Sequence, residues 1–392
     1  MPNFQTYVLK PLTYPCQHND TCFECEAISA RNNKLVVATT KGETYLVRVS
    51  QKDEKRLLIK GDKVTRPSQA SILQKVLMDF RDVSEATEIC SNIEPKRALH
   101  VKRSPFLKSI DFFASRFEVT QEIWIEVGFG SGRHLLHQAK KHPQIQFIGI
   151  EIHKPSIEQV LKQCELQHID NILVLDYDAR LFMEFLPSNC VGKIFVHFPV
   201  PWDKKPHRRV MSQSFIDEAL RVLIPSGQLE LRTDSPLYFE FSLGEMLKLS
   251  KASIHIKKNE ALEITSKYED RWLKMEKDIY DVTLVNEAFS PPIPKVGTLK
   301  FSQVIDFQKL CQSFKEETIR GDSFFVHFEE LYLIDATSGL IRISFGANER
   351  NEKCYIWIKN GVVSYFPDTV LATQNNINAD KLIKEWINGL CN

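Results

Sequence analysis

The sequence predicts a doubly wound α/β domain in the middle of the chain, between a β-rich N-terminal domain and a small α+β C-terminal domain. From about residue 101 to residue 290, short apolar runs alternate with helical stretches. Near-continuous apolar runs between helices are typical of a parallel sheet that is covered on both faces. A glycine-rich turn joins the first of these runs to a helix. Residues 1–100 and 291–392 lack this alternation, so we expect each of them to form a domain of its own.

The N-terminal 100 residues carry short β-branched and apolar runs, at residues 6–9, 34–40, 44–49 and 56–60. Lys41-Gly42, between the second run and the third, is typical of a hairpin turn. Pro67 precedes a segment with one apolar helical face, which holds Ile72, Leu73, Val76, Leu77 and Phe80. These patterns predict a small β-rich domain closed by a helix, without residues that indicate catalysis.

The remaining elements follow in order along the chain. The central segment predicts strands at residues 122–127, 146–152, 171–175, 193–197 and 227–233, with a helix from about Lys154 to Gln167. Pro291-Pro-Ile-Pro294 is typical of a linker. Beyond it we expect a helix at 303–314, strands at 324–334, 340–345 and 354–359, and a final helix around Trp386.

Charge and composition restrict the partners and the compartment. The chain has 51 basic and 50 acidic residues, a net charge of +1, so any RNA site must rest on a local basic patch. No apolar run approaches the roughly 18 residues that a membrane-spanning helix needs, and the N-terminus lacks a signal-peptide pattern. We therefore expect a cytoplasmic protein without membrane contact. The sequence leaves the oligomeric state open.

Nine cysteines are scattered along the chain, and most are expected to be free thiols in a reducing compartment. Cys16, Cys22 and Cys25, with His18 beside them, form the one cluster that could hold zinc. The second Cys-x-x-Cys pair of a zinc ribbon is absent, so free thiols are the favoured interpretation and no metal is predicted.

The strongest local signal is Glu126-Val-Gly128-Phe-Gly130-Ser-Gly132, at the junction between a strand and a helix. Glycines at this junction let the backbone approach a ligand and adopt unusual dihedral angles. The spacing is G-x-G-x-G rather than the dinucleotide fingerprint G-x-G-x-x-G, and an acid precedes it. A carboxylate at this position is better suited to bind a cationic cofactor than to bind a pyrophosphate. The alternative interpretation is a tight turn without a ligand.

Two further acids follow the next strands. Glu151 ends the second strand, 19 residues beyond Gly132, where a carboxylate can accept both ribose hydroxyls of a nucleoside. Asp178 follows the third strand, at the position that faces the adenine in such folds. Asp176 is its rival for this role. A plain helix N-cap before Ala179 is the alternative for Asp178.

A basic and aromatic loop follows the fourth strand. His197 to Arg209 contains four Lys or Arg, two His and one Trp among 13 residues. The carboxyl end of a parallel strand lies at the ligand crevice of such a sheet. A loop of this composition can bind phosphate through its cations and stack a base on its aromatic ring. The sequence therefore predicts a nucleic-acid contact here rather than a solvated turn.

Together these residues resemble the bacterial tRNA (guanine-N7)-methyltransferase family, whose members have the Rossmann-like class I methyltransferase fold. The resemblance rests on Ile125-Glu-Val-Gly-Phe-Gly-Ser-Gly132, Gly149-Ile-Glu151, Asp178-Ala179, Phe198-Pro-x-Pro-Trp-x-Lys204, Thr233-Asp234 and Ser266-Lys-Tyr-Glu269. It covers about residues 100 to 290. The flanking domains would make this chain an enlarged member of the family.

The resemblance implies S-adenosylmethionine as cofactor, tRNA as partner, and N7 of a guanosine in the tRNA variable loop as methyl acceptor. The cofactor would be bound by Glu126, Gly128, Gly130, Gly132, Glu151 and Asp178. The substrate would be bound by Lys204, Asp234, Ser266 and Glu269, with Arg208 adding a contact from the basic loop. The family usually has a catalytic Asp where this chain has Val200, and Thr where it has Ser266.

Methylation at N7 makes few chemical demands. N7 has an in-plane lone pair and no proton to lose, so no general base is needed. The enzyme must align the reactants and stabilise the positive charge that moves onto the base. Asp234 and Glu269 are the expected catalytic carboxylates, and Asp203 could partly replace the aspartate missing at Val200. A cofactor- and RNA-binding protein with little catalysis, or a methyltransferase for another substrate, are the alternative hypotheses.

Overall fold

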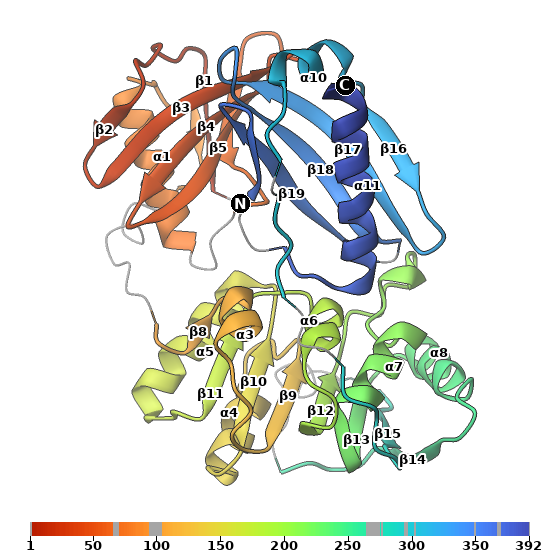
Figure 1. Ribbon diagram of the computed structural model, residues 1–392. Helices are drawn as coiled ribbons and strands as arrows, with labels where there is room; N and C mark the ends of the chain where they lie inside the picture. The colour runs from red at the N-terminus through yellow and green to blue at the C-terminus, as the bar shows by residue number, and fades with distance from the viewer. Residues whose placement is uncertain are drawn as a thin grey trace. The chain divides into compact units, whose positions relative to one another are not determined.

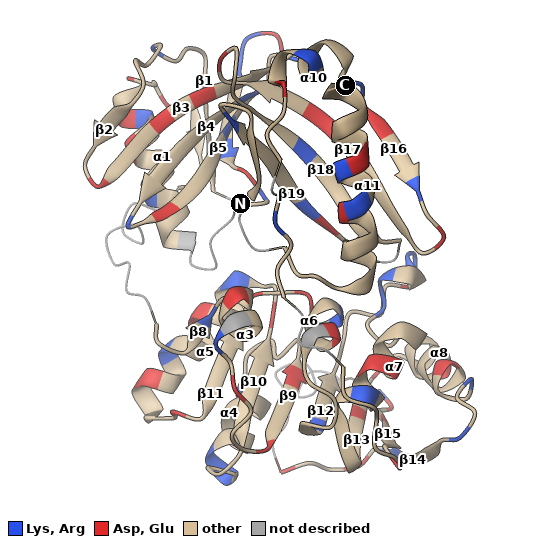
Figure 2. Cartoon of the chain, in the orientation of Figure 1, with Lys and Arg blue, Asp and Glu red and all other residues tan. Residues whose placement is uncertain are grey.

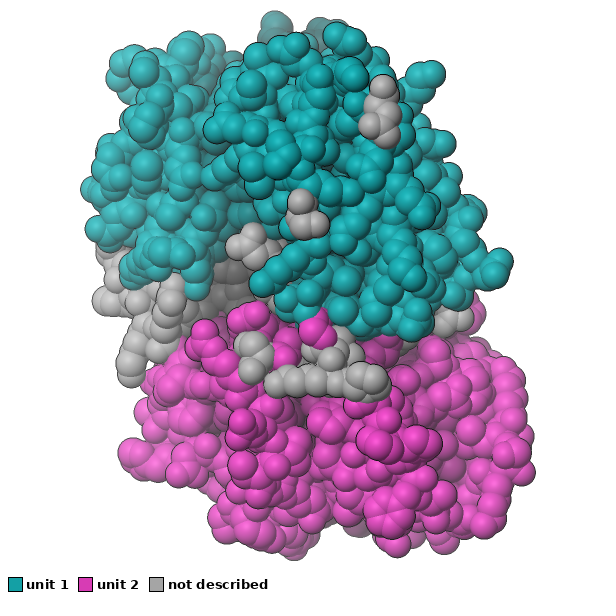
Figure 3. Space-filling model, in the orientation of Figure 1, with its two compact units in different colours: residues 1–102, 298–392 teal, residues 103–297 magenta. Residues whose placement is uncertain are grey.

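The computed structural model describes residues 2–65, 70–93, 104–263, 275, 277–293, 297–301, 303–348, 350–366 and 370–391. The chain divides into two compact units (Figures 1 and 3). One unit, here called the outer unit, combines Met1–Lys102 with Thr298–Asn392. The other, here called the central unit, is Arg103–Gly297.

The central unit is built on an eight-stranded sheet with the order β14-β15-β13-β12-β9-β10-β11-β8. Its strands are β8 (Leu107–Lys108), β9 (Ile123–Val127), β10 (Gln146–Ile150), β11 (Ile172–Leu175), β12 (Val191–His197), β13 (Leu223–Thr233), β14 (Ser253–Lys258) and β15 (Tyr280–Val285). The strands pair in parallel from β8 to β13, whereas β15 is antiparallel to both β13 and β14. The chain runs outward from β9 through β10 and β11, then returns to place β12 on the other side of β9. This reversal is the topological switch point of a doubly wound sheet, and it confirms the predicted fold class.

Helices connect the strands and pack on the sheet. They are α3 (Ile110–Ser115), α4 (Arg133–Lys141), α5 (Lys154–Gln167), α6 (Ala179–Phe185), α7 (Gln213–Val222) and α8 (Pro236–Met246). The helices α4 and α5 pack on β10 and β11, and their buried side chains share one core with Phe147 and Val174. The helix α7 packs on β13, and α8 packs on β13 and β15. Crossovers that leave the switch point in opposite directions place these two groups of helices on opposite faces.

The outer unit is one 12-stranded sheet, with the path β20-β19-β18-β17-β3-β4-β5-β6-β1-β7 and the short β2 and β16 beside it. The N-terminal part holds β1 (Asn3–Thr6), β2 (Cys16–His18), β3 (Thr21–Ser29), β4 (Lys34–Thr40), β5 (Glu43–Gln51), β6 (Leu57–Gly61), α1 (Ala70–Val83) and β7 (Cys90–Ser91). The C-terminal part holds α10 (Phe307–Ser313), β16 (Glu317–Arg320), β17 (Phe324–Leu333), β18 (Gly339–Ala347), β19 (Arg350–Lys359), β20 (Val362–Phe366) and α11 (Gln374–Cys391).

The two outer segments, expected from the sequence as separate domains, are joined through strand pairing. Tyr332 pairs with Ser29, and Leu333 pairs with Ile28, so β17 and β3 connect the two halves of the sheet. Each half contains the same series of a short strand, three long strands, a fifth strand and a helix, to which β1 and β7 are added in one half and α10 in the other. One buried cluster contains side chains of both halves, among them Leu35 and Tyr355. Antiparallel pairing and this shared core explain why the halves form one compact unit.

The cysteine cluster lies on the β2–β3 hairpin of the outer unit. Cys16 is paired with Phe23, and Cys22 with Gln17, and burial raises the pKa of the Cys25 thiol to about 11. Within the described ranges, no three His, Cys, Asp or Glu side chains are grouped so that they could hold a metal ion. The hairpin therefore gives the zinc interpretation no support.

Among the described residues, no helix has the length and apolarity needed to cross a bilayer.

Candidate functional site

The glycine-rich turn lies where β9 ends and α4 begins, beside the switch point. Gly128, Gly130 and Gly132 all have positive φ angles, of 70°, 51° and 72°. A Cβ atom on Gly132 would lie 2.1 Å from Cγ2 of Val160, so this glycine lets α4 and α5 pack closely. A Cβ atom on Gly128 would meet no atom within 4 Å, and one on Gly130 would meet only a backbone oxygen at 4.0 Å. The space beside these two glycines is open to a ligand.

The carboxylate of Glu151 holds the turn against the end of β10. Its Oε2 accepts a hydrogen bond from the backbone N–H of Gly130 at 3.0 Å. Its Oε1 accepts from the N–H groups of Ile152 at 2.8 Å and His153 at 3.0 Å. A carboxylate has about four lone-pair sites, so it can still accept from a ligand hydroxyl. The predicted ribose acceptor therefore lies next to the glycine turn and also shapes it.

The N-terminus of α4 faces the same turn without a side-chain cap. Its N-cap residue is Gly132, and its first turn contains no acidic residue. The positive end of the helix dipole makes such an end a favourable site for an anionic group. The turn therefore offers a carboxylate at Glu151 and N–H donors at α4 to one ligand.

The two rival acids after β11 have different surroundings. Asp176 forms an ion pair with the buried Lys154, and its side chain is 12% exposed. Asp178 caps α6 by accepting from the Arg180 N–H at 3.0 Å, and it pairs with the Arg180 guanidinium at 2.7 Å. The Asp178 side chain is 35% exposed. The predicted N-cap geometry is present, and Asp178 is the more accessible of the two acids.

The loop after β12 has a strained backbone and one buried cation. Phe198 and Trp202 have positive φ angles of 50° and 48°, which are uncommon for such residues. Arg209 is 7% exposed, and its Nε donates to the carbonyl oxygen of Pro201 at 2.8 Å. Its guanidinium also lies 4.7 Å from the ring centre of Phe241 and 3.4 Å from Asp203. Sequence reasoning missed this anchor, because Arg208 and Arg209 are neighbouring arginines in the same loop. Only the structure shows that Arg209 is buried and Arg208 exposed.

Val200 and the residues from Trp202 to Arg208 are exposed. Lys204 and Arg208 lie at the surface, with the Arg208 guanidinium 5.1 Å from the ring centre of Trp202. The side chain of Val200 is also exposed, at 61%. The 3-10 helix η1 (Pro206–Arg208) ends the exposed part. The loop therefore presents cations and an aromatic face to solvent, as the sequence predicts.

Asp234 follows the end of β13, the strand next to β12. Its Oδ2 accepts a hydrogen bond from Lys277 Nζ at 2.8 Å. Asp203, in the neighbouring loop, has a 55% exposed side chain. Ser266 and Glu269 lie outside the described residues, so the structure does not place this part of the predicted substrate pocket.

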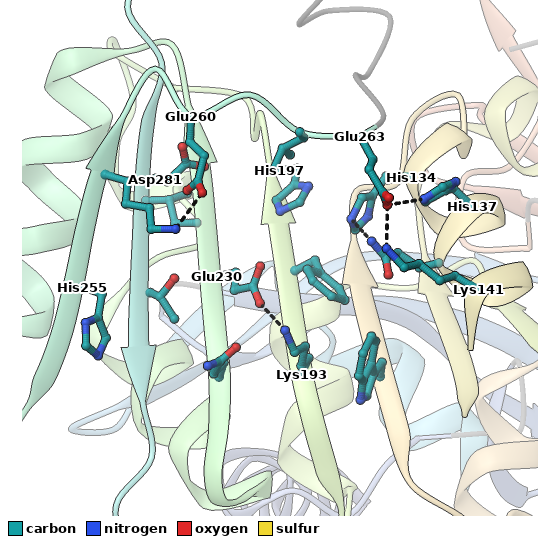
Figure 4. A pocket seen from close by; sticks show the side chains of 18 of the residues that line it. His134, His137, Lys141, Lys193, His197, Glu230, His255, Glu260, Glu263 and Asp281 are labelled. Atoms are coloured by element: carbon teal, nitrogen blue, oxygen red, sulfur yellow. Dashed lines mark hydrogen bonds and ion pairs between the residues drawn. The ribbon is translucent and has the colours of Figure 1, made fainter. Parts of the chain in front are cut away.

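A groove of about 720 Å³ lies on the sheet face beside α4 (Figure 4). Strands β12 to β15 line it with polar side chains, and α4 forms one wall. Its charges neutralise one another in three ion pairs of 2.6–2.9 Å: Lys193 with Glu230, Lys257 with Glu260, and Lys141 with Glu263. None of the predicted site residues lines this groove. Ligands of open α/β sheets bind outside the carboxyl ends of the strands, so we place the candidate site at the glycine turn.

Comparison with known proteins identifies the family. A family model described as "Putative methyltransferase" matches residues 120–282. The chain is 41% identical to a tRNA (guanine-N(7)-)-methyltransferase of Wolinella succinogenes, over 99% of this chain and 100% of the relative. The chain belongs to the tRNA (guanine-N(7)-)-methyltransferase family.

A second relative also matches the outer unit, whereas the solved structures match part of the chain. A family member of Campylobacter jejuni is 39% identical over 98% of both chains, so the match to these relatives includes the outer segments. Among solved structures, a rRNA methylase from Streptococcus thermophilus covers 45% of this chain and 93% of its own length, with 11% identity and a TM-score of 0.32. The enlarged form of the family, predicted from the sequence, is confirmed by the full-length relatives.

The buried guanidinium of Arg209 predicts that Arg209→Lys loosens the loop after β12. Lysine loses the Nε donor to Pro201 and the contact between the guanidinium and the Phe241 ring, which together contribute about 1–2 kcal/mol. The amides of Lys205 and Arg208, which are bonded to carbonyl groups within the loop, should exchange with deuterium about tenfold faster. Arg208→Lys is the matched control, and equal exchange in both variants would contradict the anchoring role.

Proposed function

We propose that this protein transfers a methyl group from S-adenosylmethionine to N7 of a guanosine in tRNA. The full-length similarity to relatives named tRNA (guanine-N(7)-)-methyltransferase carries this proposal. The glycine turn held by Glu151 supports it, since this turn has the open space and polar groups that a nucleoside cofactor needs. We also propose that the protein is cytoplasmic, in keeping with a tRNA substrate.

We propose that the cofactor binds along the carboxyl ends of β9, β10 and β11. Glu151 would accept the ribose hydroxyls, and Asp178 would accept from the adenine amino group. The uncapped N-terminus of α4 would receive the carboxylate of the methionine part, and Glu126 its ammonium group. Gly128 and Gly130 would leave room for the part of the cofactor that joins its nucleoside to its methionine part.

We propose that tRNA is held by the exposed loop after β12. Figure 2 shows Lys and Arg interspersed with Asp and Glu over both units, in keeping with the net charge of +1. Binding of a polyanion then depends on local clusters of cations rather than on the field of the whole chain. Lys204 and Arg208 would meet phosphates, while Trp202 offers a stacking face. Ser266 and Glu269 keep the substrate role that the family resemblance implies.

The proposed mechanism uses alignment and charge stabilisation. When bound, S-adenosylmethionine supplies a methyl group on a cationic sulfonium. Asp234 would accept from the guanine edge, fix the base in the plane of attack and stabilise the positive charge that develops on it. Lys277 holds the Asp234 carboxylate at 2.8 Å before the base arrives. Because N7 carries no proton, the loss of the family aspartate at Val200 removes a contributor and leaves the reaction possible.

The decisive experiment is incubation of the protein with methyl-labelled S-adenosylmethionine and unmodified tRNA, followed by nucleoside mapping. Label in 7-methylguanosine is the expected result. Cofactor binding without transfer would favour the RNA-binding alternative, and label in another nucleoside would favour a different substrate. Fully modified tRNA, which has no free acceptor, serves as the control.

The contacts of Glu151 predict that Glu151→Ala weakens binding of S-adenosylmethionine about 10- to 100-fold, or about 1–3 kcal/mol. The variant loses the ribose acceptor and the bond that holds the Gly130 N–H. Calorimetric titration with the cofactor alone measures this effect without tRNA. Glu165→Ala, an exposed acid on α5, is the control. Unchanged affinity for Glu151→Ala would remove this residue from the site.

The exposed cations predict that the double variant Lys204→Ala and Arg208→Ala raises the KM for tRNA. Each lost phosphate contact should reduce the slope of log affinity against log salt by about one. Affinity for the cofactor should stay at the parent value. Lys162→Ala, an exposed lysine on α5, is the control. If the double variant binds tRNA like the parent at every salt concentration, the RNA path lies elsewhere.

The position of Asp234 predicts that Asp234→Asn lowers the single-turnover rate about 100-fold or more, the scale for losing one preorganised polar partner of a transition state. Asp217→Asn, an exposed acid on α7, should keep the parent rate. Val200→Asp should change the rate only modestly, because the chemistry needs no proton acceptor. If the parent protein is inert and Val200→Asp alone makes it active, this electrostatic account is contradicted.

A further inference from the structure

The acid that precedes the glycine turn is held by a histidine of the next helix. Glu126, on β9, is 4% exposed, and His134, in the first turn of α4, is 9% exposed. The Glu126 Oε2 and the His134 Nδ1 lie 2.8 Å apart. Within the described part of the chain, His134 is the one hydrogen-bond partner of this carboxylate. The acid is therefore buried with one oxygen bonded and the other open to a donor.

The bonds of His134 determine its tautomer. The amide nitrogen of Gln138, one turn further along α4, lies 3.2 Å from His134 Nε2. An amide nitrogen can only donate, so Nε2 accepts and the ring proton is on Nδ1. The Nδ1–H group therefore donates a hydrogen bond to the Glu126 carboxylate. The hydrogen bonds therefore form a directed chain, which runs from Gln138 through His134 to the Glu126 carboxylate.

Two rings pack against His134. The ring of His197 lies 4.6 Å from the His134 ring, and the ring of Phe195 lies 4.8 Å from it. Burial, together with the neighbouring His134 and Arg232, holds the pKa of His197 well below its usual value. Arg232 is paired with Asp281. Packed rings of this kind fix the orientation of His134.

We propose that His134 is a positioning residue, which fixes Glu126 so that its second oxygen meets the ammonium group of S-adenosylmethionine. This inference rests on the proposed function. Three features of the structure support it: the 2.8 Å bond, the burial of both partners and the directed chain from Gln138. A carboxylate held by a neighbour on a rigid helix is preorganised, so binding need not restrict it further. The same helix, α4, offers its uncapped N-terminus to the cofactor carboxylate.

The competing explanation is that His134 only satisfies a buried carboxylate and stabilises the fold. The two explanations differ in their dependence on the ligand. A stability role predicts equal effects on every ligand of the turn. A positioning role predicts an effect only on ligands that carry the ammonium group.

The test compares His134→Leu, which removes the donor, with His134→Asn, whose side-chain amide nitrogen replaces Nδ1. Calorimetry measures binding of S-adenosylmethionine and of 5′-methylthioadenosine, which keeps the nucleoside and lacks the amino acid part. His134→Leu should weaken S-adenosylmethionine about tenfold or more and leave methylthioadenosine within about twofold. His134→Asn should regain most of the lost affinity. His137→Leu, a partly exposed histidine of the same helix that pairs with Glu263, is the matched control.

The outcomes separate this inference from the proposed function. Equal loss for both ligands, or no loss for S-adenosylmethionine, would overturn the positioning role while the parent still binds cofactor and methylates tRNA. A parent that binds no S-adenosylmethionine would instead contradict the proposed function. Glu126→Ala combined with His134→Leu should bind S-adenosylmethionine no more weakly than Glu126→Ala alone, because both variants remove one contact. A further loss in the combined variant would also count against the inference.

Discussion

The carboxylate of Glu151 connects the two strand ends on which the candidate site is built. It accepts the N–H of Gly130 after β9 and the N–H groups that follow β10, at 2.8–3.0 Å. These backbone donors lie beyond the carboxyl ends of two central strands, where strand pairing no longer satisfies them. The positive φ angles of the turn and the start of α4, with His134 in its first turn, lie directly beside this junction. A ligand at the turn therefore meets a surface whose shape is determined before it binds.

Much of the central unit could be predicted from the sequence, because its signals are local. Apolar runs separated by helical stretches predict a parallel sheet, and α5 covers Lys154–Gln167, the range that periodicity predicts. The junction of β9, the glycine turn and α4 is also a short-range pattern. Three strands of the observed sheet, β8, β14 and β15, were missed: β8 is only two residues long, and β14 and β15 lie beyond the regular alternation.

What the sequence did not predict depends on pairing and burial over long separations. Ser29 and Tyr332 pair across about 300 positions, and no local pattern in either segment indicates this partner. Arg208 and Arg209 are equivalent as letters, yet one is exposed and the other is buried against Phe241. His134 has no motif of its own, and its role emerges only when Glu126 and Gln138 are placed around it. The place of the glycine turn between β9 and α4 was predictable from a local pattern, whereas the contacts that support the turn were not.

The central claim is that guanine N7 is methylated by alignment and charge stabilisation, without a proton acceptor at Val200. The most direct measurement is the single-turnover rate of 7-methylguanosine formation as a function of pH. The account predicts a rate that changes little from about pH 6 to about pH 9, since no group must lose a proton in the chemical step. A rate that rises with pH through a single ionisation, or the absence of 7-methylguanosine at every pH, would contradict it.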